Sequence, residues 1–403
     1  MTKKKIGIFW ENFDYGGVGT YLITLLNNKR LKNFQITIFT NTTNKAINKS
    51  FRKEIGNKID LKIVVYKSIN VIFFKNIIFK IIFHALRPLL FFLSIIQIYF
   101  LLKSRRFDYF ISQCGGFGDF RSDFASIIPA KILKYPVRTV VLHHCYTRPR
   151  LWGGLINLIN YFIAKFCSSF IFVSKATFKD IKKNTPILKN KKIYHEIIHN
   201  GISTKKITKR KNYSKNINTI VLSRLEYSKG HLDLIEAFKY LPKKTREKFK
   251  VHFVGKGDKK FVEFLKKKVA DSNLNNIFKF KGYINEESRK ILSKYDLLIS
   301  PSRDFEGFGL SIAESLSVGV PVISTKVGGV LDYLDNKNSI LVKAKSPRSL
   351  ASSIQLFLTN RIKYEKKAIV GKKLIQNSFS EDKMAHNYVK HLKRVKNLNV
   401  QNS

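Results

Sequence analysis

Cysteine is scarce in this chain of 403 residues. Its three cysteines, Cys114, Cys145 and Cys167, show neither CxxC spacing nor a pairing pattern. Such usage differs from that of disulfide-stapled secreted domains and favours a reducing cytosol. The apolar run near the amino end, Ile6–Trp10, is too short for a secretory signal peptide and fits a first β-strand. We therefore expect a cytoplasmic protein.

Acidic side chains are also few: 27 Asp and Glu stand against 75 Lys and Arg, which gives a formal net charge of +48. Residues 1–200 carry 33 basic and 9 acidic side chains, which is half of the net positive charge of the chain. The charge is therefore spread evenly, and no basic arm or basic domain stands out. Zinc-ligand spacing, an RNA-binding aromatic signature and a basic region leading into heptads are all missing, and we expect no nucleic-acid partner. The charge fits equally an anionic membrane surface, at roughly 1 kcal/mol per well-placed cation, and a drift of composition.

The sequence has no uninterrupted apolar run long enough to cross a bilayer. In the most hydrophobic segment, the uncharged stretch Leu89–Leu102 spans only fourteen residues, whereas a crossing helix needs roughly 20. Within the apolar segment 71–102, polar and basic residues share one helical stripe and apolar residues cover the rest, a pattern typical of a helix in a membrane interface. The stripe is Asn76, Lys80, His84 and Arg87, and Pro88 is expected to kink or end the helix. The alternative is a pair of core helices.

Strand-like apolar runs alternate with helical patterns along the chain, which predicts a parallel α/β architecture. The chain is too long for one ordinary core, and two domains fit the pattern. In the first half the predicted strands are 6–10, 34–39, 61–66, 109–112, 139–142 and 170–174. In the second half they are 220–223, 251–254, 278–281, 297–300 and the run after Pro321.

The most informative segment is Asp304–Glu314, which places two carboxylates, Glu306 and Glu314, around a glycine-rich turn. The turn follows a predicted strand and leads into a helix that begins near Leu310. In open α/β sheets ligands bind at this end of the strands, and a helix amino terminus there favours an anion such as a diphosphate. The carboxylates suit neutral hydroxyl groups, as sugars and riboses supply them.

A pair of cations follows another predicted strand. Arg224 and Lys229 lie five positions apart between strand 220–223 and a helix start at Gly230. Fixed cations at this place would neutralise a departing anionic group and so lower the barrier to its departure. In a chain so rich in lysine, Lys229 alone is weak evidence for such an anion site. Arg224, at the carboxyl end of a predicted strand, is stronger evidence.

Three further turns also follow predicted strands. Gly16 and Gly17 form a glycine turn after the first strand, and because the spacing is not GxGxxG, a nicotinamide cofactor is not expected. Gly282 and Tyr283 follow strand 278–281. The segment 143–150 contains two histidines, of which His144 is slightly preferred over His143 as a site residue, together with Arg148 and Arg150.

Taken with these motifs, nearly the whole chain resembles the family-4 type of retaining glycosyltransferases, the glycosyl transferases group 1 with the GT-B fold. Asp304–Glu314 resembles the Glu-x7-Glu motif of that family, and Arg224 with Lys229 resembles its diphosphate clamp. The resemblance implies two Rossmann-like, doubly wound domains that face a central crevice. It places a first, acceptor-side domain at 1–200, a nucleotide-sugar domain at 201–378 and a final helix, 379–403, that returns to the first domain.

The resemblance also implies roles for individual residues. Glu306, His144, Arg224 and Lys229 would act in catalysis, and Glu314 would bind the ribose. The sequence contains no Asp-x-Asp, the motif with which other sugar-transferring folds hold a metal, so neither a metal nor a cofactor is expected. The expected donor-binding residues are Gly16, Gly17, Arg224, Lys229, Gly282, Tyr283, Glu306, Gly307, Phe308, Gly309, Leu310 and Glu314. Arg148 and Arg150 would meet a phosphate on the acceptor or be ordinary surface charge.

The resemblance predicts transfer, with retention, of a sugar from a UDP- or GDP-linked donor to a lipid-linked or glycan acceptor, by an enzyme bound to the inner face of the membrane. Synthesis of cell-surface polysaccharide, lipopolysaccharide or glycolipid is the expected setting. Two alternatives remain: a nucleotide-sugar epimerase of the same fold, and a basic nucleic-acid-binding protein whose sugar site has decayed.

Overall fold

The structure is a computed structural model, and its contacts divide the chain into two compact units. Unit 1 comprises Met1–Gly201 and Glu381–Ser403, and unit 2 comprises Ile202–Ser380. The structure describes residues 3–12, 16–44, 51, 54–55, 59–69, 77–117, 120–147, 152–188, 193–208 and 216–401.

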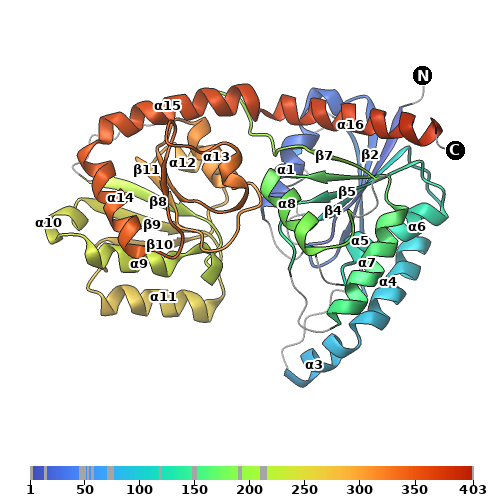
Figure 1. The fold of residues 1–403 in the computed structure, drawn as a ribbon, viewed down its shortest axis with the longest axis horizontal. Helices are drawn as coiled ribbons and strands as arrows, with labels where there is room; N and C mark the ends of the chain where they lie inside the picture. Colours follow the sequence, from blue (N-terminus) through green and yellow to red (C-terminus); the bar gives the residue numbers. More distant parts are fainter. Residues whose placement is uncertain are drawn as a thin grey trace. The chain divides into compact units, whose positions relative to one another are not determined.

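Unit 1 is built on a seven-stranded parallel sheet with the order β3-β2-β1-β4-β5-β6-β7 (Figure 1). All six strands predicted in the first half are present. The edge strand β7, which is only four residues long, was not predicted as a strand. The strands are β1 (Lys4–Phe9), β2 (Phe34–Asn41), β3 (Asp60–Tyr66), β4 (Tyr109–Cys114), β5 (Val137–Leu142), β6 (Ser169–Phe172) and β7 (Tyr194–Ile197).

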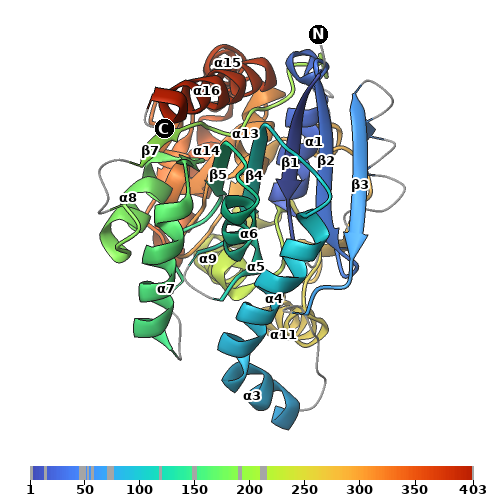
Figure 2. The same cartoon turned by 90° about the vertical axis from the view of Figure 1, so that its right-hand side faces the viewer.

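Helices cover both faces of this sheet, as Figures 1 and 2 show. One face carries α1 (Gly17–Leu26) and α16 (Glu381–Gln401), and the other carries α4 (Arg87–Leu102), α6 (Ile127–Ile132) and α7 (Gly153–Phe166). The remaining helices are η1 (Lys29–Leu31), α3 (Ile77–Ala85), α5 (Ser122–Ala125) and α8 (Lys175–Asn184).

The apolar segment 71–102 forms two helices where it is described, α3 and α4. Pro88 lies in the first turn of α4, where its missing N–H costs no hydrogen bond, so the predicted break is confirmed. Phe91, Ile98 and Leu102 of α4 are buried against the sheet, as the alternative of core helices requires. In the part of the chain that the structure describes, no helix is long and apolar enough to span a membrane. Of the polar stripe, Asn76 lies outside the described residues.

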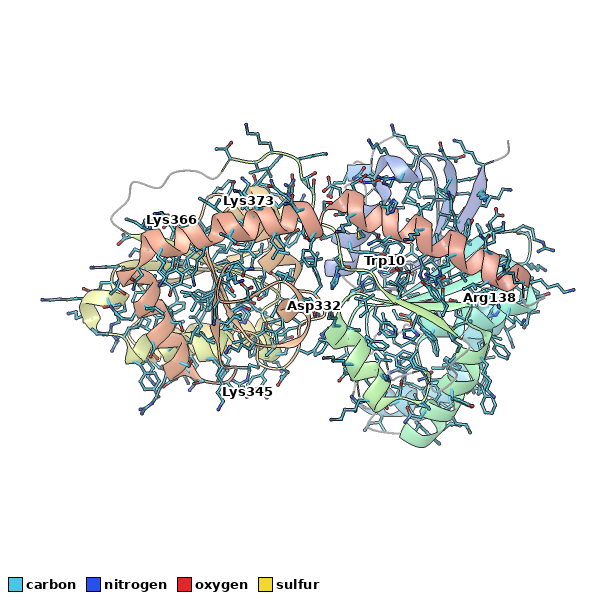
Figure 3. All side chains as sticks on the ribbon, turned by 45° about the horizontal axis from the view of Figure 1, so that its top comes forward. Trp10, Arg138, Asp332, Lys345, Lys366 and Lys373 are labelled. Atoms are coloured by element: carbon cyan, nitrogen blue, oxygen red, sulfur yellow. The ribbon has the colours of Figure 1, made fainter. Side chains whose placement is uncertain are left out.

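The interior of unit 1 is strongly aromatic, because strands buried on both faces consist of continuous apolar runs. Phe110, Phe124 and Phe170 are fully or almost fully buried between the sheet and the helices. Trp10, at the end of β1, also lies inside the unit with 1% of its surface exposed (Figure 3). Aromatic side chains bury a large area each, so they contribute much of the stability of this unit.

The carboxyl-terminal helix α16 belongs to unit 1. His391 on its inner face is buried and lies 2.9 Å from both Glu196 Oε2 and Ser169 Oγ. At its start, Arg30 and Asp382 form an ion pair of 2.8 Å. These polar contacts fix the register of the helix along the sheet.

Unit 2 contains a six-stranded parallel sheet with the order β10-β9-β8-β11-β12-β13. Each strand predicted in the second half is present, and only the three-residue β13 was not predicted. The strands are β8 (Ile217–Leu222), β9 (Phe249–Val254), β10 (Phe278–Gly282), β11 (Leu297–Ser300), β12 (Val322–Thr325) and β13 (Ile340–Val342). The helices are η3 (Tyr227–Lys229), α9 (His231–Tyr240), α10 (Lys243–Arg246), α11 (Lys259–Asp271), α12 (Ser288–Leu292), α13 (Leu310–Ser317), η4 (Gly328–Asp332), α14 (Pro347–Thr359) and α15 (Arg361–Ser378).

Candidate functional site

The strand order of unit 2 creates a switch point between β8 and β11. From β8 the chain adds β9 and β10 on one side, and then crosses back to add β11, β12 and β13 on the other. The loops that follow β8 and β11 therefore leave the sheet edge in opposite directions, and we refer to the place between them as the crevice. Ligands of open α/β sheets bind at such a point. Both predicted motifs of the second half, Arg224–Lys229 and Glu306–Glu314, begin here.

Lys229 and Glu306 meet across this switch point. The ammonium nitrogen of Lys229 lies 2.7 Å from Oε1 of Glu306, and each side chain is 15% exposed. The hydroxyl of Ser302 donates to the same carboxylate oxygen at 2.5 Å. The structure thus brings together two predicted site residues that are 77 positions apart in the sequence. The pair is partly shielded from water, so its mutual attraction is stronger than that of an exposed pair.

Two glycines allow the crevice loops to approach this closely. Gly230, after Lys229, has φ of 72°, and a Cβ on it would lie 1.8 Å from the carbonyl oxygen of Pro301. Gly328 has φ of 61°, and a Cβ on it would lie 2.2 Å from the carbonyl oxygen of Glu306. That oxygen accepts a hydrogen bond from the N–H of Gly329 at 2.7 Å. The backbone around Glu306 is therefore fixed from both sides.

The predicted turn 307–310 leads directly into α13, which begins at Leu310 as expected. Gly309 precedes the helix with φ of 81°, a conformation that favours glycine. The buried hydroxyl of Tyr333 lies 2.9 Å from the carbonyl oxygens of both Phe308 and Gly309, and it holds the turn in place. The first amides of a helix have no partner within the helix, so this turn directs N–H groups at the crevice.

Glu314 lies on α13, one turn beyond that amino terminus. It is buried, with 8% of its surface exposed. Burial raises the pKa of its carboxyl to about 7, against opposing effects of the Ser288 hydroxyl and the Arg289 guanidinium. A carboxyl with this pKa exchanges its proton near neutral pH, and it accepts hydrogen bonds fully only when ionised.

Arg224 and Tyr283 are the exposed members of the predicted set. The Arg224 side chain is 62% exposed and forms an ion pair of 2.7 Å with Glu226. Tyr283 is 45% exposed, and the Lys256 ammonium lies 4.9 Å from its ring centre. Gly282 before it has φ of 65°, and its carbonyl oxygen accepts a hydrogen bond from the N–H of Gly255 at 2.9 Å. These residues are available to a ligand at the β8, β9 and β10 end of the sheet.

A second ion pair, which the sequence did not predict, supports the Lys229 turn. Arg303 lies 2.6 Å from Asp233 on α9, and its guanidinium lies 4.6 Å from the ring centre of Tyr227. The N–H of Arg303 donates to the carbonyl oxygen of Ser228 at 2.8 Å. The three contacts tie the loop after β11 to η3, which carries Lys229. The sequence could have drawn attention to Arg303, because it directly precedes the Glu-x7-Glu segment. Nothing in the sequence pointed to Asp233 as its partner.

Unit 1 holds the other predicted residues. Gly16 caps α1, and its carbonyl oxygen accepts from the N–H of Gly19 at 2.9 Å, while Gly17 opens the helix. His144 is half-buried, with Nδ1 3.1 Å from Sγ of Cys145. Arg148 and Arg150 lie outside the described residues.

His143, by contrast, is an interior residue. Its Nε2 lies 2.7 Å from Oε1 of Gln113, its ring packs edge-on against Tyr21, and burial lowers its pKa to about 3. A neutral, buried imidazole of this kind stabilises the interior of unit 1. His144 is therefore the more accessible of the two histidines, although its catalytic role stays a prediction.

The switch point of unit 1, between β1 and β4, contains one buried carboxyl that the sequence did not predict. Glu11 follows β1 and forms hydrogen bonds with the hydroxyls of Tyr66 and Ser122. Burial raises the pKa of this carboxyl above its usual range, against the hydrogen bonds that lower it. Through these two hydrogen bonds Glu11 joins the end of β1 to β3 and α5.

The ligand class of the unit 2 crevice follows from its polar groups. Among the described residues, no group of three or more His, Cys, Asp and Glu side chains could hold a metal ion. The crevice presents instead a cation, carboxylates, hydroxyls and the amides of a helix start, which suit an anionic group attached to a polyhydroxylated one.

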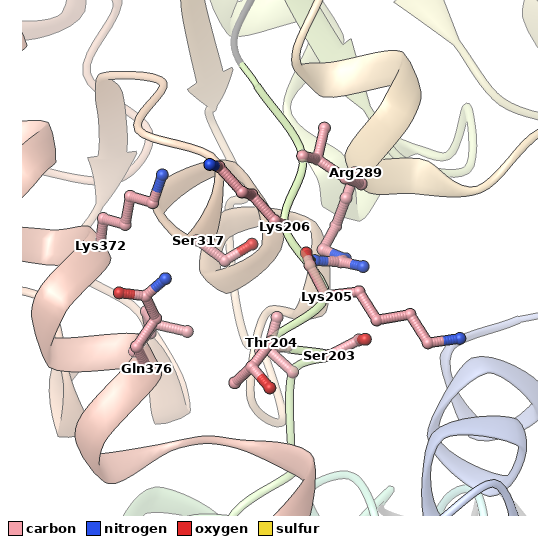
Figure 4. Close-up of a pocket in the computed structure, with 11 residues that line it drawn as sticks. Ser203, Thr204, Lys205, Lys206, Arg289, Ser317, Lys372 and Gln376 are labelled. Carbon is pink, nitrogen blue, oxygen red and sulfur yellow. The ribbon is translucent and has the colours of Figure 1, made fainter.

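A separate cavity of about 340 Å³ lies elsewhere in unit 2 (Figure 4). It lies between the segment 202–207, the carboxyl end of α13 and helix α15, and Lys206 and Lys372 extend beside it. None of the predicted donor residues lines it. It is therefore distinct from the crevice at the switch point.

Comparisons with known proteins agree with this arrangement. Residues 203–374 match the family described as glycosyl transferases group 1. An uncharacterised glycosyltransferase of Methanocaldococcus jannaschii is 25% identical over 69% of this chain and 74% of its own length. The O-antigen biosynthesis glycosyltransferase WclY of Escherichia coli is 26% identical over 48% of this chain, which spans about half (53%) of that relative.

Solved structures extend the likeness to both units. HepE of Anabaena, in complex with UDP and glucose, superposes with a TM-score of 0.74 at 18% identity, over 97% of this chain and 100% of that one. Sucrose-phosphate synthase of Thermosynechococcus elongatus gives a TM-score of 0.75 at 15% identity, over 97% and 99%. This chain therefore has the two-domain GT-B fold, and its residues 203–374 match the glycosyl transferases group 1 family.

Proposed function

We propose that this protein is a retaining glycosyltransferase that moves a sugar from a nucleotide-sugar donor to a membrane-associated glycan or lipid-linked acceptor. The observation that carries the proposal is the Lys229–Glu306 pair at the switch point of unit 2, beside the amino terminus of α13. A nucleotide sugar has an anionic diphosphate next to two polyhydroxylated rings. The crevice offers a complementary group for each part.

The diphosphate is the leaving group, and it gains negative charge as the bond to the sugar breaks. Lys229 has three N–H donors, so it can keep Glu306 and still donate to a phosphate oxygen. Arg224, exposed and flexible, provides a second cation, and the α13 amides provide neutral donors. This set stabilises the departing charge without a metal, and the proposed reaction is accordingly metal-independent.

The two carboxylates have different parts of the donor as partners. Glu306, fixed by Ser302 and Lys229, orients the sugar next to the reacting carbon. Glu314, deeper in the site, accepts from the ribose hydroxyls. Gly282 and Tyr283 lie on the β10 side and meet the nucleobase.

Retention follows from attack on the face that the diphosphate leaves. The bond from the anomeric carbon to the phosphate oxygen breaks, a bond to the acceptor oxygen forms on the same face, and the acceptor proton passes to the leaving phosphate. The proposed mechanism is this same-face attack, without a covalent glycosyl-enzyme intermediate. His144 and the Gly16–Gly17 turn of unit 1 are proposed to serve the sugar and the acceptor.

The relatives support a donor of this class. Solved relatives carry UDP and UDP-glucose, and we propose a UDP- or GDP-linked donor for this chain. Relatives are named for O-antigen and teichuronic acid biosynthesis, so a cell-surface polysaccharide, lipopolysaccharide or glycolipid is the proposed product. The proposed location is the cytoplasmic face of the membrane, with peripheral attachment.

The test is to incubate the purified protein with a panel of radiolabelled nucleotide sugars and a membrane extract. We expect one donor to label a lipid-linked or glycan product and to release its nucleoside diphosphate. Recovery of an intact but epimerised donor would instead identify an epimerase. Absence of both products, together with no binding of any nucleoside diphosphate, would overturn the proposal.

A further inference from the structure

Helices α4 and α7 carry apolar side chains on the side that faces away from the sheet. On α4 the exposed stripe consists of Leu89, Phe92, Ile96 and Phe100, at spacings of three and four residues. On α7 it consists of Leu155, Leu158, Phe162 and Phe166, with the same helical spacing. These eight side chains are between 37% and 58% exposed. We refer to them together as the outer apolar face.

Each helix is apolar on its inner side too. Phe91 and Ile98 of α4, and Ile156 and Ile163 of α7, are buried against the sheet. A helix that is apolar all round is normally covered on every side. The outer apolar face is thus a surface for which the described part of the chain provides no cover, and large exposed apolar patches mark interaction sites.

The two stripes lie on the same side of unit 1. Helix α6 packs against both α4 and α7, and Figure 2 shows the three helices side by side on one face of the sheet. Ile132 at the end of α6, the helix between them, is a further exposed apolar residue, with 58% of its surface exposed. The stripes therefore lie on neighbouring helices of one side of unit 1, and we treat them as one surface.

The charges around this surface have one sign. No Asp or Glu occurs from residue 61 to 107 or from 124 to 179, the segments that contain α3, α4, α6 and α7. Lys103 lies over the ring of Phe100 at 4.5 Å, and Lys165 lies over the ring of Phe162 at 5.2 Å. Each lysine thus holds its ammonium over an aromatic ring of its own stripe, so a cation accompanies the apolar side chains on both helices. Apolar and cationic side chains on one helix surface are typical of helices that bind anionic lipid.

We propose that α4 and α7 together form a lipid-docking surface, and that its partner is an anionic bilayer. The segment 71–102 alone would give one helix in the interface, whereas the structure assigns a second contact to α7, for which the sequence analysis made no prediction. The complete lack of acidic side chains favours a negatively charged lipid surface over a protein partner of mixed charge. This inference deepens the proposed membrane attachment and rests on it, but not on the sugar chemistry.

Trp152 fits this role at the amino end of α7. It is 48% exposed, has φ of 62° and precedes the helix directly. Tryptophan is enriched at membrane interfaces because its ring is apolar and its N–H is polar. Because α7 follows the loop that contains His144, docking through α7 would bring that loop near the lipid surface, where a lipid-linked acceptor is found.

The test measures binding of the full chain to vesicles of phosphatidylcholine, with and without phosphatidylglycerol, by co-sedimentation. Leu158→Asp/Phe162→Asp on α7 and Phe92→Asp/Ile96→Asp on α4 should each lower the affinity for the anionic vesicles at least about tenfold. The matched control is Ile362→Asp/Ile369→Asp on α15, which changes two exposed isoleucines of unit 2 and should bind as the parent does. High salt should weaken parent binding only in part, since apolar burial is not screened.

Parent-like vesicle binding by the α7 variant would overturn the role of α7. A parent dimer that the α7 variant dissociates, with vesicle binding unchanged, would show that a second copy covers the face instead. Thermal unfolding monitors folding of each variant, and Leu158→Gln/Phe162→Gln replaces the Asp variant if that one does not fold. A protein that binds vesicles but transfers no sugar would refute the proposed function and leave this inference intact.

Discussion

Lys229 and Glu306 form an ion pair of 2.7 Å, and the proposed function assigns them to the donor's leaving group and sugar. Replacing Lys229 with Ala removes a charge-assisted contact worth about 1.5–3 kcal/mol and leaves Glu306 without its cation. We expect kcat/KM of Lys229→Ala to fall at least about tenfold, and that of Arg224→Ala to fall as well. Lys239→Ala, which breaks an exposed pair with Glu236 in the same unit, is the control and should remain active. Parent-like activity in either site variant, or complete loss of parent activity on adding a chelator, would contradict the metal-independent clamp.

Glu306 and Glu314 can be separated by a ligand that has a ribose but no sugar. Calorimetry with a nucleoside diphosphate should show weaker binding to Glu314→Gln than to Glu306→Gln, since only Glu314 is assigned to the ribose. Glu306→Gln should chiefly lower turnover, because a misoriented sugar loses contacts in the transition state. The reverse pattern would mean that the two carboxylates have been assigned the wrong way round.

Burial of Glu314 also predicts a dependence of stability on pH. Its folded-state pKa of about 7 lies above the ordinary value of 4.5, so the fold favours the protonated carboxyl. The associated stability is complete below about pH 4.5 and is lost as the pH rises through 7. Glu314→Gln, which imitates the protonated form, should therefore raise the free energy of unfolding at pH 8 by up to about 3 kcal/mol and change it little at pH 5.

Denaturant unfolding at the two pH values measures this difference. The exposed Glu247, replaced by Gln, serves as the control and should show no difference between them. An equal effect of Glu314→Gln at both pH values would show that its carboxyl is ionised in the fold throughout.

The sequence identified the residue types of the crevice but not their contacts. Glycines, carboxylates and cations that follow predicted strands must lie at one sheet edge, and this reasoning found Lys229 and Glu306 separately. Their ion pair could not be predicted, because it depends on side-chain directions in two loops 77 positions apart. For the same reason Tyr333 and the Arg303–Asp233 pair, which brace the turns, were missed. The burial of Glu314 depends on the packing of α12 against α13, which no local pattern shows.

The turn between η3 and α9 shows how the elements of unit 2 constrain the site. Gly230→Ala would require both a left-handed backbone and movement away from the Pro301 carbonyl oxygen, 1.8 Å from the added Cβ. Gly282→Ala is the matched control, since it also has positive φ but no atom lies within 4 Å of its Cβ. Gly282→Ala should cost about 1 kcal/mol of stability, and Gly230→Ala distinctly more, with weaker nucleoside diphosphate binding through displacement of Lys229. If denaturant unfolding shows the same loss of stability for both variants, the backbone at Pro301 can move to accommodate the added Cβ.

Among the elements, the long apolar strands and the helix start at Leu310 were predicted correctly. β7 and β13 were missed because strands of three or four residues at a sheet edge have too few positions to show a pattern. In the segment 71–102, α4 buries one apolar side, as core helices require, and exposes another. That the exposed side lies in a membrane interface stays a prediction. Only tertiary packing decides which side of such a helix faces the core.

The chain as a whole combines a GT-B fold with a net charge of +48. The fold could be predicted from the sequence, because motif order and strand alternation extend over both units. The significance of the charge could not, since a uniform excess fits both compositional drift and attraction to anionic lipid. The segments that contain α4 and α7 lack acidic residues, which favours attraction to anionic lipid at these helices. Vesicle binding tests this attraction independently of the reaction.

The most direct test of the central claim is to follow the reaction by proton NMR, with the donor found in the panel and a chelator present. We predict that an α-linked nucleotide sugar gives an α-linked product and one equivalent of free nucleoside diphosphate, and that Lys229→Ala gives neither at a comparable rate. A β-linked product, an epimerised donor, or a reaction that Lys229→Ala leaves unchanged would contradict the account.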